Sequence, residues 1–264
     1  MSAAVARTHA QADAVVAPEV TLIEVAAGAM KNNNYLVVDP VTRQALLVDP
    51  AWQRDKLEAA LQRAGATLSA IAITHAHFDH VHLAGELSAA HDCPVWMSQC
   101  EIETSGFDLP RLLAIDETPR TLGALRIEPI LAPGHTPGCL CYRIGGHLFA
   151  GDVLFIEGCG LCRDEAAAHA MFGSLERLKR ELAPDTRIHP GHTYLRGPGV
   201  PFAELLRWNM YLQFPDKRSF AAYRLRRGLH PLQVGRLPLS AAAPQPQNPA
   251  PTSSRPINRQ SYRT

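Results

Sequence analysis

The run THAHFDH at residues 74–80 is the part of the sequence best suited to chemistry. It places three imidazoles and one carboxylate within six positions, at His75, His77, Asp79 and His80. Imidazole and carboxylate groups are good ligands for zinc and for neighbouring transition metals. Burying these four side chains without a metal would leave many polar atoms without a partner. The run therefore indicates a metal site.

Three more candidate ligands follow, each at the end of an apolar segment or in a loop rich in glycine and proline. His135 lies in PGHTPG (133–138), Asp152 ends FAGD (149–152), and His192 ends HPGH (189–192). Each signal is weak alone, because a histidine in a loop is usually a surface residue. Together and in this order, they strengthen the prediction of a metal site.

The hydrophobic pattern predicts the elements that must position these residues. Short apolar or alternating segments predict strands at 20–25, 35–39, 44–49, 68–74, 94–98, 112–115, 126–132, 140–144, 147–150 and 186–189. Helices are expected at 55–64, 79–91, 166–182 and 202–213. The ligand run thus begins where a strand ends. This order of elements favours an α/β sandwich of two sheets flanked by helices.

The two ends of the chain differ in composition from the part between them. Residues 1–17 are rich in alanine and show no periodic pattern, and from Leu237 onward Pro, Gln, Ala and Ser dominate. We expect a disordered leader at 1–17, one folded domain at 18–232 and a disordered Pro-rich tail at 233–264.

Composition limits which binding partners and which cellular location we expect for the protein. The formal net charge is +1, and no apolar run approaches the roughly 20 residues that a membrane span needs. We therefore expect neither nucleic acid nor a membrane as a partner. The start lacks the pattern of a secretion signal, so we expect a cytoplasmic protein with six reduced cysteines. Cys159 and Cys162 stand alone as a pair, and we assign them no metal or redox role.

The candidate ligands resemble the full ligand set of the metallo-β-lactamase superfamily over residues 20–192. This resemblance implies an αβ/βα four-layer sandwich, a hydrolase domain with metals at one edge between the sheets. It also implies one metal held by His75, His77 and His135, a second held by Asp79, His80 and His192, and Asp152 bridging both. Asp49 resembles a family aspartate that orients the ligand loop. A simple turn aspartate before Pro50 is the alternative for Asp49.

The chemistry that the resemblance implies is hydrolysis at a dinuclear centre. Two zinc ions per chain are expected from family precedent, and the ligands also suit iron or manganese. Two ions held side by side would lower the pKa of a shared water toward neutrality. Such a centre would supply a hydroxide for attack on a polarised carbonyl. We assign Asp79 the catalytic role of accepting a proton as the intermediate collapses.

Two further stretches are similar to glyoxalase II-type thioesterases, GDVLFIEGCG (151–160) and GHTY (191–194). The resemblance implies a thioester substrate, and we expect Tyr194 and Arg163 to bind it. Leu161 stands where that family has a basic residue, and Arg163 stands where it has an aromatic one. The helical segment after 201 is also shorter than in that family. These departures count against a glutathione pocket.

A closer resemblance is to the zinc acyl hydrolases of trans-acyltransferase polyketide pathways. MKNNNY (30–35), EGCGLC (157–162) and NMYLQF (209–214) carry it. It implies release of stalled acyl groups from acyl carrier proteins, so we expect an acyl carrier protein or a small thioester as the partner. A basic segment could steer an acidic carrier, although a solvated helix face is the alternative. Its residues are Lys217, Arg218, Arg224, Arg226 and Arg227.

Three other functions stay open at this point. Hydroxyacylglutathione hydrolase (glyoxalase II) shares the ligand set, and a mononuclear iron persulfide dioxygenase keeps much of it. A non-catalytic binding protein on this fold would be expected to have lost ligands, yet all seven are present. The sequence leaves the acyl group and the oligomeric state undetermined.

Overall fold

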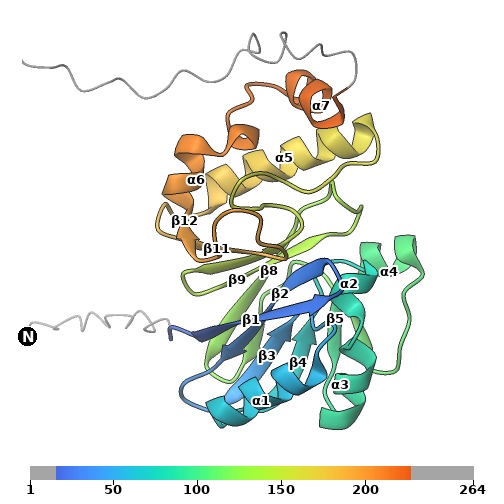
Figure 1. The fold of residues 1–264 in the computed structure, drawn as a ribbon, viewed down its shortest axis with the longest axis vertical. Helices are drawn as coiled ribbons and strands as arrows, with labels where there is room; N and C mark the ends of the chain where they lie inside the picture. Colours follow the sequence, from blue (N-terminus) through green and yellow to red (C-terminus); the bar gives the residue numbers. More distant parts are fainter. Residues whose placement is uncertain (1–15, 227–264) are drawn as a thin grey trace, which may run out of the picture.

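The computed structural model describes residues 16–226, in which the elements fall into two halves (Figure 1). The first half contains β1 (Glu19–Ala27), β2 (Met30–Val38), β3 (Gln44–Val48), α1 (Arg54–Ala64), β4 (Thr67–Ala72), α2 (Phe78–Val81), α3 (Ala84–His91), β5 (Val95–Ser98), α4 (Gln99–Ser105) and β6 (Leu112–Ile115). The second contains β7 (Arg120–Leu122), β8 (Leu125–Leu131), β9 (Leu140–Ile144), β10 (His147–Gly151), α5 (Glu165–Glu181), β11 (Arg187–Pro190), β12 (Val200–Pro201), α6 (Phe202–Trp208), a 3₁₀ turn (Met210–Leu212) and α7 (Lys217–Leu225). The predicted tail and all but two residues of the predicted leader lie outside the described residues.

Each half forms a six-stranded sheet, with strand orders β1-β2-β3-β4-β5-β6 and β12-β11-β10-β9-β8-β7. In the second sheet β9 runs antiparallel to both β8 and β10, and β11 runs parallel to β10. Hence β8, β10 and β11 point the same way, and their carboxyl ends meet at one edge. The segments that carry His135, Asp152 and His192 follow those three ends. The topology therefore brings these side chains together although the sequence separates them.

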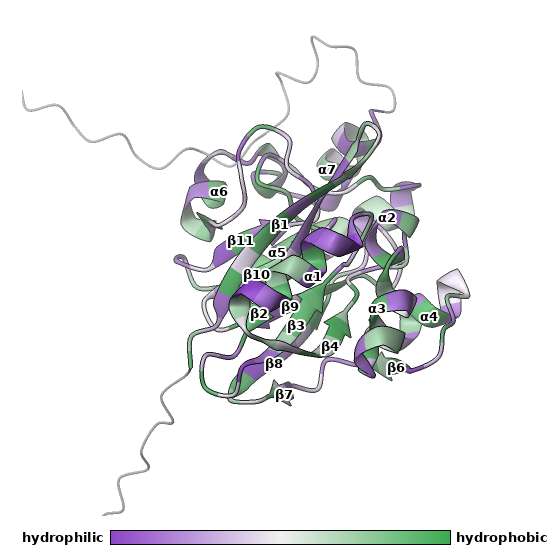
Figure 2. Ribbon diagram, turned by 60° about the horizontal axis from the view of Figure 1, so that its bottom comes forward, coloured by the Kyte–Doolittle hydropathy of each residue, from purple (hydrophilic) through white to green (hydrophobic). Residues whose placement is uncertain are grey.

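The strands in the middle of each sheet are buried on both faces, which explains their continuous apolar sequences. In β3, Leu46 and Val48 face a core between the two sheets, whereas Ala45 and Leu47 face the helices of the first half. Figure 2 shows β3 and β4 as hydrophobic ribbons inside the molecule. A third core lies between the second sheet and α5 to α7. These layers, helix–sheet–sheet–helix, confirm the predicted αβ/βα sandwich (Figure 1).

Several predicted boundaries were wrong, and hydrogen bonds to distant residues explain why. The helix expected at 79–91 is divided into α2 and α3, because the backbone N–H of Leu83 donates to Pro50 across the loop. The helix expected at 202–213 ends at Trp208. There the buried Asn209 turns its amide to the backbone carbonyls of Phe155 and Gly158. The elements α4, β7, β12 and α7 were not predicted.

No helix within residues 16–226 is long and apolar enough to cross a membrane.

Candidate metal centre

The ligand run leaves β4 along a backbone path fixed by the second sheet. The N–H of Leu140 donates to the carbonyl of Thr74 at 2.8 Å, and the hydroxyl of Tyr142 donates to that of Ile73 at 2.9 Å. The acceptors belong to the two residues before His75, which is fully buried. The run is therefore anchored to the opposite sheet at the point where its ligands begin.

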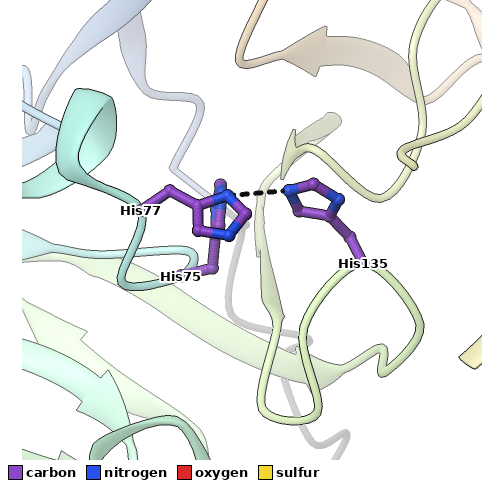
Figure 3. A group of neighbouring side chains, drawn as sticks. All are labelled: His75, His77 and His135. Carbon is purple, nitrogen blue, oxygen red and sulfur yellow. Dashed lines mark hydrogen bonds between the residues drawn. The ribbon is translucent and has the colours of Figure 1, made fainter. Parts of the chain in front are cut away.

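The first cluster consists of His75, His77 and His135 (Figure 3). Nδ1 of His77 lies 3.0 Å from Nε2 of His75 and 3.0 Å from Nε2 of His135. The three ligand nitrogens lie within 4.8 Å of one another. Three converging imidazoles are a set of ligands suited to one zinc ion.

The second cluster consists of Asp79, His80 and His192, whose ligand atoms also lie within 4.8 Å of one another. Nε2 of His192 lies 3.4 Å from Oδ2 of Asp79, and Nε2 of His80 lies 3.5 Å from the same oxygen. Two nitrogens and one carboxylate thus face a common point. This is a second set of ligands for one metal ion.

Asp152 stands between the two clusters and turns one oxygen to each. Its Oδ2 lies 3.6 Å from Nε2 of His135, and its Oδ1 lies 3.5 Å from Nε2 of both His80 and His192. Gly191 permits this close approach: a Cβ there would lie 2.6 Å from His80 and 2.7 Å from Asp152. The structure brings all seven predicted ligands together. Ligand atoms of His75, His80 and Asp152 also lie within 4.8 Å of one another, so the predicted division of the ligands between two ions stays a prediction.

Unpartnered buried atoms indicate that these residues fit a metal. Nε2 of His80 and Oδ1 of Asp152 are buried and have no hydrogen-bond partner among the described residues. In two other ligands, the ring nitrogen that faces away from the cluster has a partner. Nδ1 of His135 contacts the Leu161 carbonyl at 2.9 Å, and Nδ1 of His192 contacts the Lys31 carbonyl at 2.7 Å. Such contacts orient an imidazole so that its free nitrogen faces a metal. The donor set fits zinc, iron or manganese.

Asp49 occupies the supporting position predicted for it. Its carboxylate accepts hydrogen bonds from the N–H and hydroxyl of Thr74, both at 2.7 Å, and Oδ2 lies 2.9 Å from Nδ1 of His80. It therefore contacts the start of the ligand run and one ligand of the second cluster. The backbone φ of Asp49 is 50°, an uncommon conformation for a non-glycine residue, consistent with a position set by these contacts.

Burial and neighbouring charges shift the pKa values of the ligands in different directions. Burial lowers the pKa of His75 and the neighbouring imidazoles lower it further, which keeps a nitrogen lone pair available. Burial raises the pKa of Asp79, but a hydrogen bond with His192 and the charge of His80 outweigh it and hold that pKa well below its usual range. Burial lowers the pKa of His192, but the nearby carboxylates of Asp152 and Asp79 raise it to about 10. A bound cation would replace the proton of His192.

Three asparagines of β2 support the second cluster, and their supporting role was not predicted. Asn32 donates to Asp79, Asn33 donates to the Pro190 carbonyl at 3.1 Å and to Thr193 at 2.9 Å, and Asn34 donates to the Asp49 carbonyl. All three are buried. The available signal was a run of polar residues at the start of an apolar segment, where strands rarely carry asparagine.

A cavity of about 740 Å³ opens beside the first cluster. His77 and His135 line it at one end, and small apolar side chains of α5 line another wall, including Ala167 and Ala170. Arg163 also lines the cavity; its side chain is largely exposed and bonds Asp164 at 3.1 Å. The cavity is large enough for a small ligand next to the metal ligands.

The two predicted substrate-binding residues lie on different segments. Tyr194 is exposed and packs its ring against Phe155 at 5.1 Å, two residues beyond His192. Arg163 belongs to the cavity beside His77 and His135. Their predicted contact with a substrate stays a prediction.

Only part of the predicted basic segment has exposed cations that an acidic partner could reach. Lys217 and Arg218 are exposed on the first turn of α7. Arg224 instead donates to the Gly160 carbonyl at 2.8 Å and lies over the ring of Tyr211, so its guanidinium is used within the protein. Arg227 lies outside the described residues.

Comparison with known proteins shows the family. Residues 27–192 match the family model described as the metallo-beta-lactamase superfamily. "Probable polyketide biosynthesis zinc-dependent hydrolase PksB" of Bacillus subtilis (strain 168) is 37% identical over 74% of this chain and 88% of its own length. A hydroxyacylglutathione hydrolase of Gloeobacter violaceus is 37% identical over 84% of each chain.

Among solved structures, TTHA1623 in a di-iron-bound form is 31% identical and superposes with a TM-score of 0.58, covering 72% of this chain and 100% of that one. Both sequence relatives are named as hydrolases. The chain belongs to the metallo-beta-lactamase superfamily, where its sequence relatives include zinc-dependent hydrolases.

Proposed function

We propose that this chain is a dinuclear zinc hydrolase that cleaves acyl thioesters, and that its substrate is an acyl group attached to an acyl carrier protein. The observation that carries this proposal is the pair of ligand clusters joined by Asp152 beside an apolar cavity. A relative named as a zinc-dependent hydrolase of polyketide biosynthesis supports the same function.

The first cluster would hold one zinc ion and the second cluster the other, with one oxygen of Asp152 toward each. When bound, two zinc ions supply an activated water and polarise a carbonyl oxygen. The same ligands suit iron, and a solved relative contains two iron ions. Metal analysis of the purified protein separates these cases.

The chain's own residues contribute orientation and proton transfer. Asp79 has an ionised carboxylate that is held by Asn32, and we assign it the acceptance of a proton during breakdown of the tetrahedral intermediate. A thiolate leaves without much protonation, because thiols are acidic compared with alcohols and amines. No separate general acid is therefore needed for a thioester.

The cavity beside the first cluster suits the acyl chain. Its α5 wall is formed by alanines, whose short side chains leave room for an aliphatic group. Arg163 is the exposed cation at this cavity, and we assign it to the phosphate of the phosphopantetheine arm, which a guanidinium binds well.

Exposed apolar side chains on the ligand-bearing loops support a protein-bound substrate. Phe78 is 66% exposed, Leu161 71% and Leu195 86%. Phe78 lies between two ligands, the carbonyl of Leu161 contacts His135, and Leu195 follows His192 by three positions. A small thioester would leave these side chains uncovered, whereas a carrier protein would cover them.

The test compares three thioesters with the zinc-loaded enzyme: one acyl group on a carrier protein, the same group on N-acetylcysteamine, and S-lactoylglutathione. We expect hydrolysis of the carrier thioester to be fastest. Leu195→Asp should lower kcat/KM for the carrier thioester at least about tenfold and leave the N-acetylcysteamine thioester nearly unchanged. Leu113→Asp is the matched control, because Leu113 is also exposed but lies on β6.

A glutathione thioester is the second candidate, because a relative of equal identity is named hydroxyacylglutathione hydrolase. If S-lactoylglutathione alone is hydrolysed and Leu195→Asp does not change its rate, the substrate is a glutathione thioester and not an acyl carrier protein. If no thioester reacts, oxygen consumption with a persulfide tests the dioxygenase alternative.

A further inference from the structure

Glu101 is a buried carboxylate outside the predicted ligand set. It lies on α4 with 1% of its surface exposed. Its Oε1 accepts a hydrogen bond from the N–H of Ala76 at 2.8 Å. Its Oε2 accepts one from the hydroxyl of Thr136 at 2.6 Å and one from the N–H of Gly138 at 3.1 Å.

These three contacts join the two loops of the first cluster. Ala76 lies between His75 and His77, and Thr136 directly follows His135. The first loop comes from one sheet and the second loop from the other. Glu101 therefore links the two segments whose separation decides how far the imidazoles stand apart.

The helix and the loop are fitted closely around this carboxylate. Ser98 caps α4 by accepting from the N–H of Glu101 and donates its hydroxyl to the carbonyl of Gly138 at 2.6 Å. A Cβ on Gly138 would lie 2.2 Å from the backbone nitrogen of Glu101. The loop of His135 thus lies directly against the first turn of α4.

Burial of the Glu101 carboxylate lowers the stability of the fold unless its contacts compensate for the lost hydration. No ion pair connects Glu101 to a lysine, arginine or histidine within the described part of the chain, so its charge is met only by neutral donors. A buried carboxylate without a cation is destabilising relative to an apolar side chain that would pack the same helix. Its geometry points to the metal cluster rather than to the general stability of the fold.

The second cluster has a separate support. Asn33 binds the loop of His192 through Pro190 and Thr193, and none of its contacts reaches the loop of His135. Conversely, the side chain of Glu101 contacts no residue of the His192 loop through the bonds described above. Glu101 thus contacts the loop of His135, which carries a ligand of the first cluster, and Asn33 contacts the loop of His192, which carries a ligand of the second.

We propose that Glu101 is a positioning residue of the first cluster and controls the affinity of that metal site more strongly than the affinity of the second. The inference rests on the metal centre of the proposed function. By holding both loops at a fixed distance, the Glu101 carboxylate keeps three imidazoles ready for one ion. Glu101 belongs to none of the ligand groups among the described residues, so it would act through the two loops.

The experiment measures zinc affinity at each site separately by competition with a chromophoric chelator. His192→Ala leaves the first cluster intact, and His135→Ala leaves the second intact. Glu101→Gln is introduced into both backgrounds, because glutamine keeps the shape but presents an N–H₂ to a donor. Glu103→Gln is the matched control, since Glu103 is exposed on the same helix.

We expect Glu101→Gln to weaken zinc binding about 10- to 100-fold in the His192→Ala background and less than about 3-fold in the other. Cobalt substitution should show an altered electronic spectrum for the first site alone. Asn33→Ala should give the reverse pattern. The control should change neither site.

Equal weakening of both sites, together with a lower melting temperature of the metal-free protein, would mean that Glu101 only stabilises the fold, and would overturn the inference. Unchanged affinity at both sites would overturn it as well. A parent protein that binds no zinc would refute the metal centre itself, a result distinguishable from the other two.

Discussion

Asn32 donates two hydrogen bonds to Asp79, one to carboxylate Oδ2 at 2.9 Å and one to the backbone carbonyl at 3.0 Å. Its own carbonyl oxygen accepts from the indole N–H of Trp52 at 2.7 Å. Because Trp52 holds the side-chain oxygen of Asn32, the N–H₂ group of this amide points to Asp79 in one orientation only. This fixes the rotamer of the residue to which we assign proton transfer.

Replacing Asn32 should impair catalysis without unfolding the protein. Asn32→Ala releases the Asp79 carboxylate, and we expect kcat to fall about 10- to 100-fold, as is typical when a residue that orients a metal ligand is removed. Asn32→Asp, which places a second carboxylate beside Asp79, should be worse. Steady-state kinetics with an acyl thioester measures both variants. A wild-type kcat for Asn32→Ala would show that Asp79 keeps its orientation unaided.

Replacing Asp79 removes both a ligand and the assigned proton acceptor. Asp79→Ala should lower kcat at least about 100-fold in zinc-saturated protein, while the circular dichroism spectrum stays that of the parent. Asp79→Asn retains a carbonyl oxygen as a possible ligand and separates ligation from proton transfer. Retained activity in a metal-replete Asp79→Ala sample would contradict the mechanism.

The two clusters predict the metal content of ligand variants. The parent should bind two zinc ions per chain, and His135→Ala and His192→Ala should each retain one, because each removes a ligand from a different cluster. Asp152→Ala should weaken both sites, since its two oxygens face different clusters. Inductively coupled plasma mass spectrometry after equilibrium dialysis checks this. One zinc ion in the parent would favour a mononuclear centre.

The seven ligands that the resemblance implied lie close together, and the positions of the strand ends give a physical reason. Each of His75, His135, Asp152 and His192 comes shortly after a strand, and strand ends that point the same way share one edge of a sheet. The order of the strands can be predicted from short apolar segments of the sequence. The αβ/βα architecture and the family followed from the resemblance of the ligands, and the comparisons bear both out.

Apart from Asp49, which the family resemblance supplied, supporting residues could not be predicted from strand ends, because their partners are remote in sequence. Asn32 and Asp79 are 47 positions apart, and Asn33 and Thr193 are 160 apart. Polar residues also led us to begin the strand at 35, whereas β2 begins at Met30. For α4 a local signal did exist: Ser98 and Glu101 have the spacing of a capping box. That spacing predicts a helix start but not the contacts of the carboxylate.

Asn209 should contribute strongly to stability, although it lies outside the clusters. Its amide donates to the carbonyls of Phe155, Ile156 and Gly158 at 3.1 to 3.3 Å, and the residue is fully buried. Asn209→Ala leaves these acceptors without their donor, so the free energy of unfolding should fall by about 3 kcal/mol. Urea unfolding measures the loss. Arg207→Ala, at an exposed position of α6, is the control and should change stability little.

The size of the cavity beside the first cluster should decide which acyl chains are accepted. Ala170 lines that cavity from α5, and Ala170→Leu would fill part of it with an isobutyl group. If the acyl chain occupies the cavity, kcat/KM for an octanoyl thioester should fall about tenfold or more, because each methylene that loses its place is worth about 1 kcal/mol or more. The acetyl thioester should change less than about threefold, since its short chain does not reach α5. Gly173→Leu adds a similar side chain to the same helix where a Cβ meets nothing within 4 Å, and it should leave both substrates unchanged. An equal loss for octanoyl and acetyl thioesters would place the acyl chain elsewhere and leave the cavity to the thiol arm.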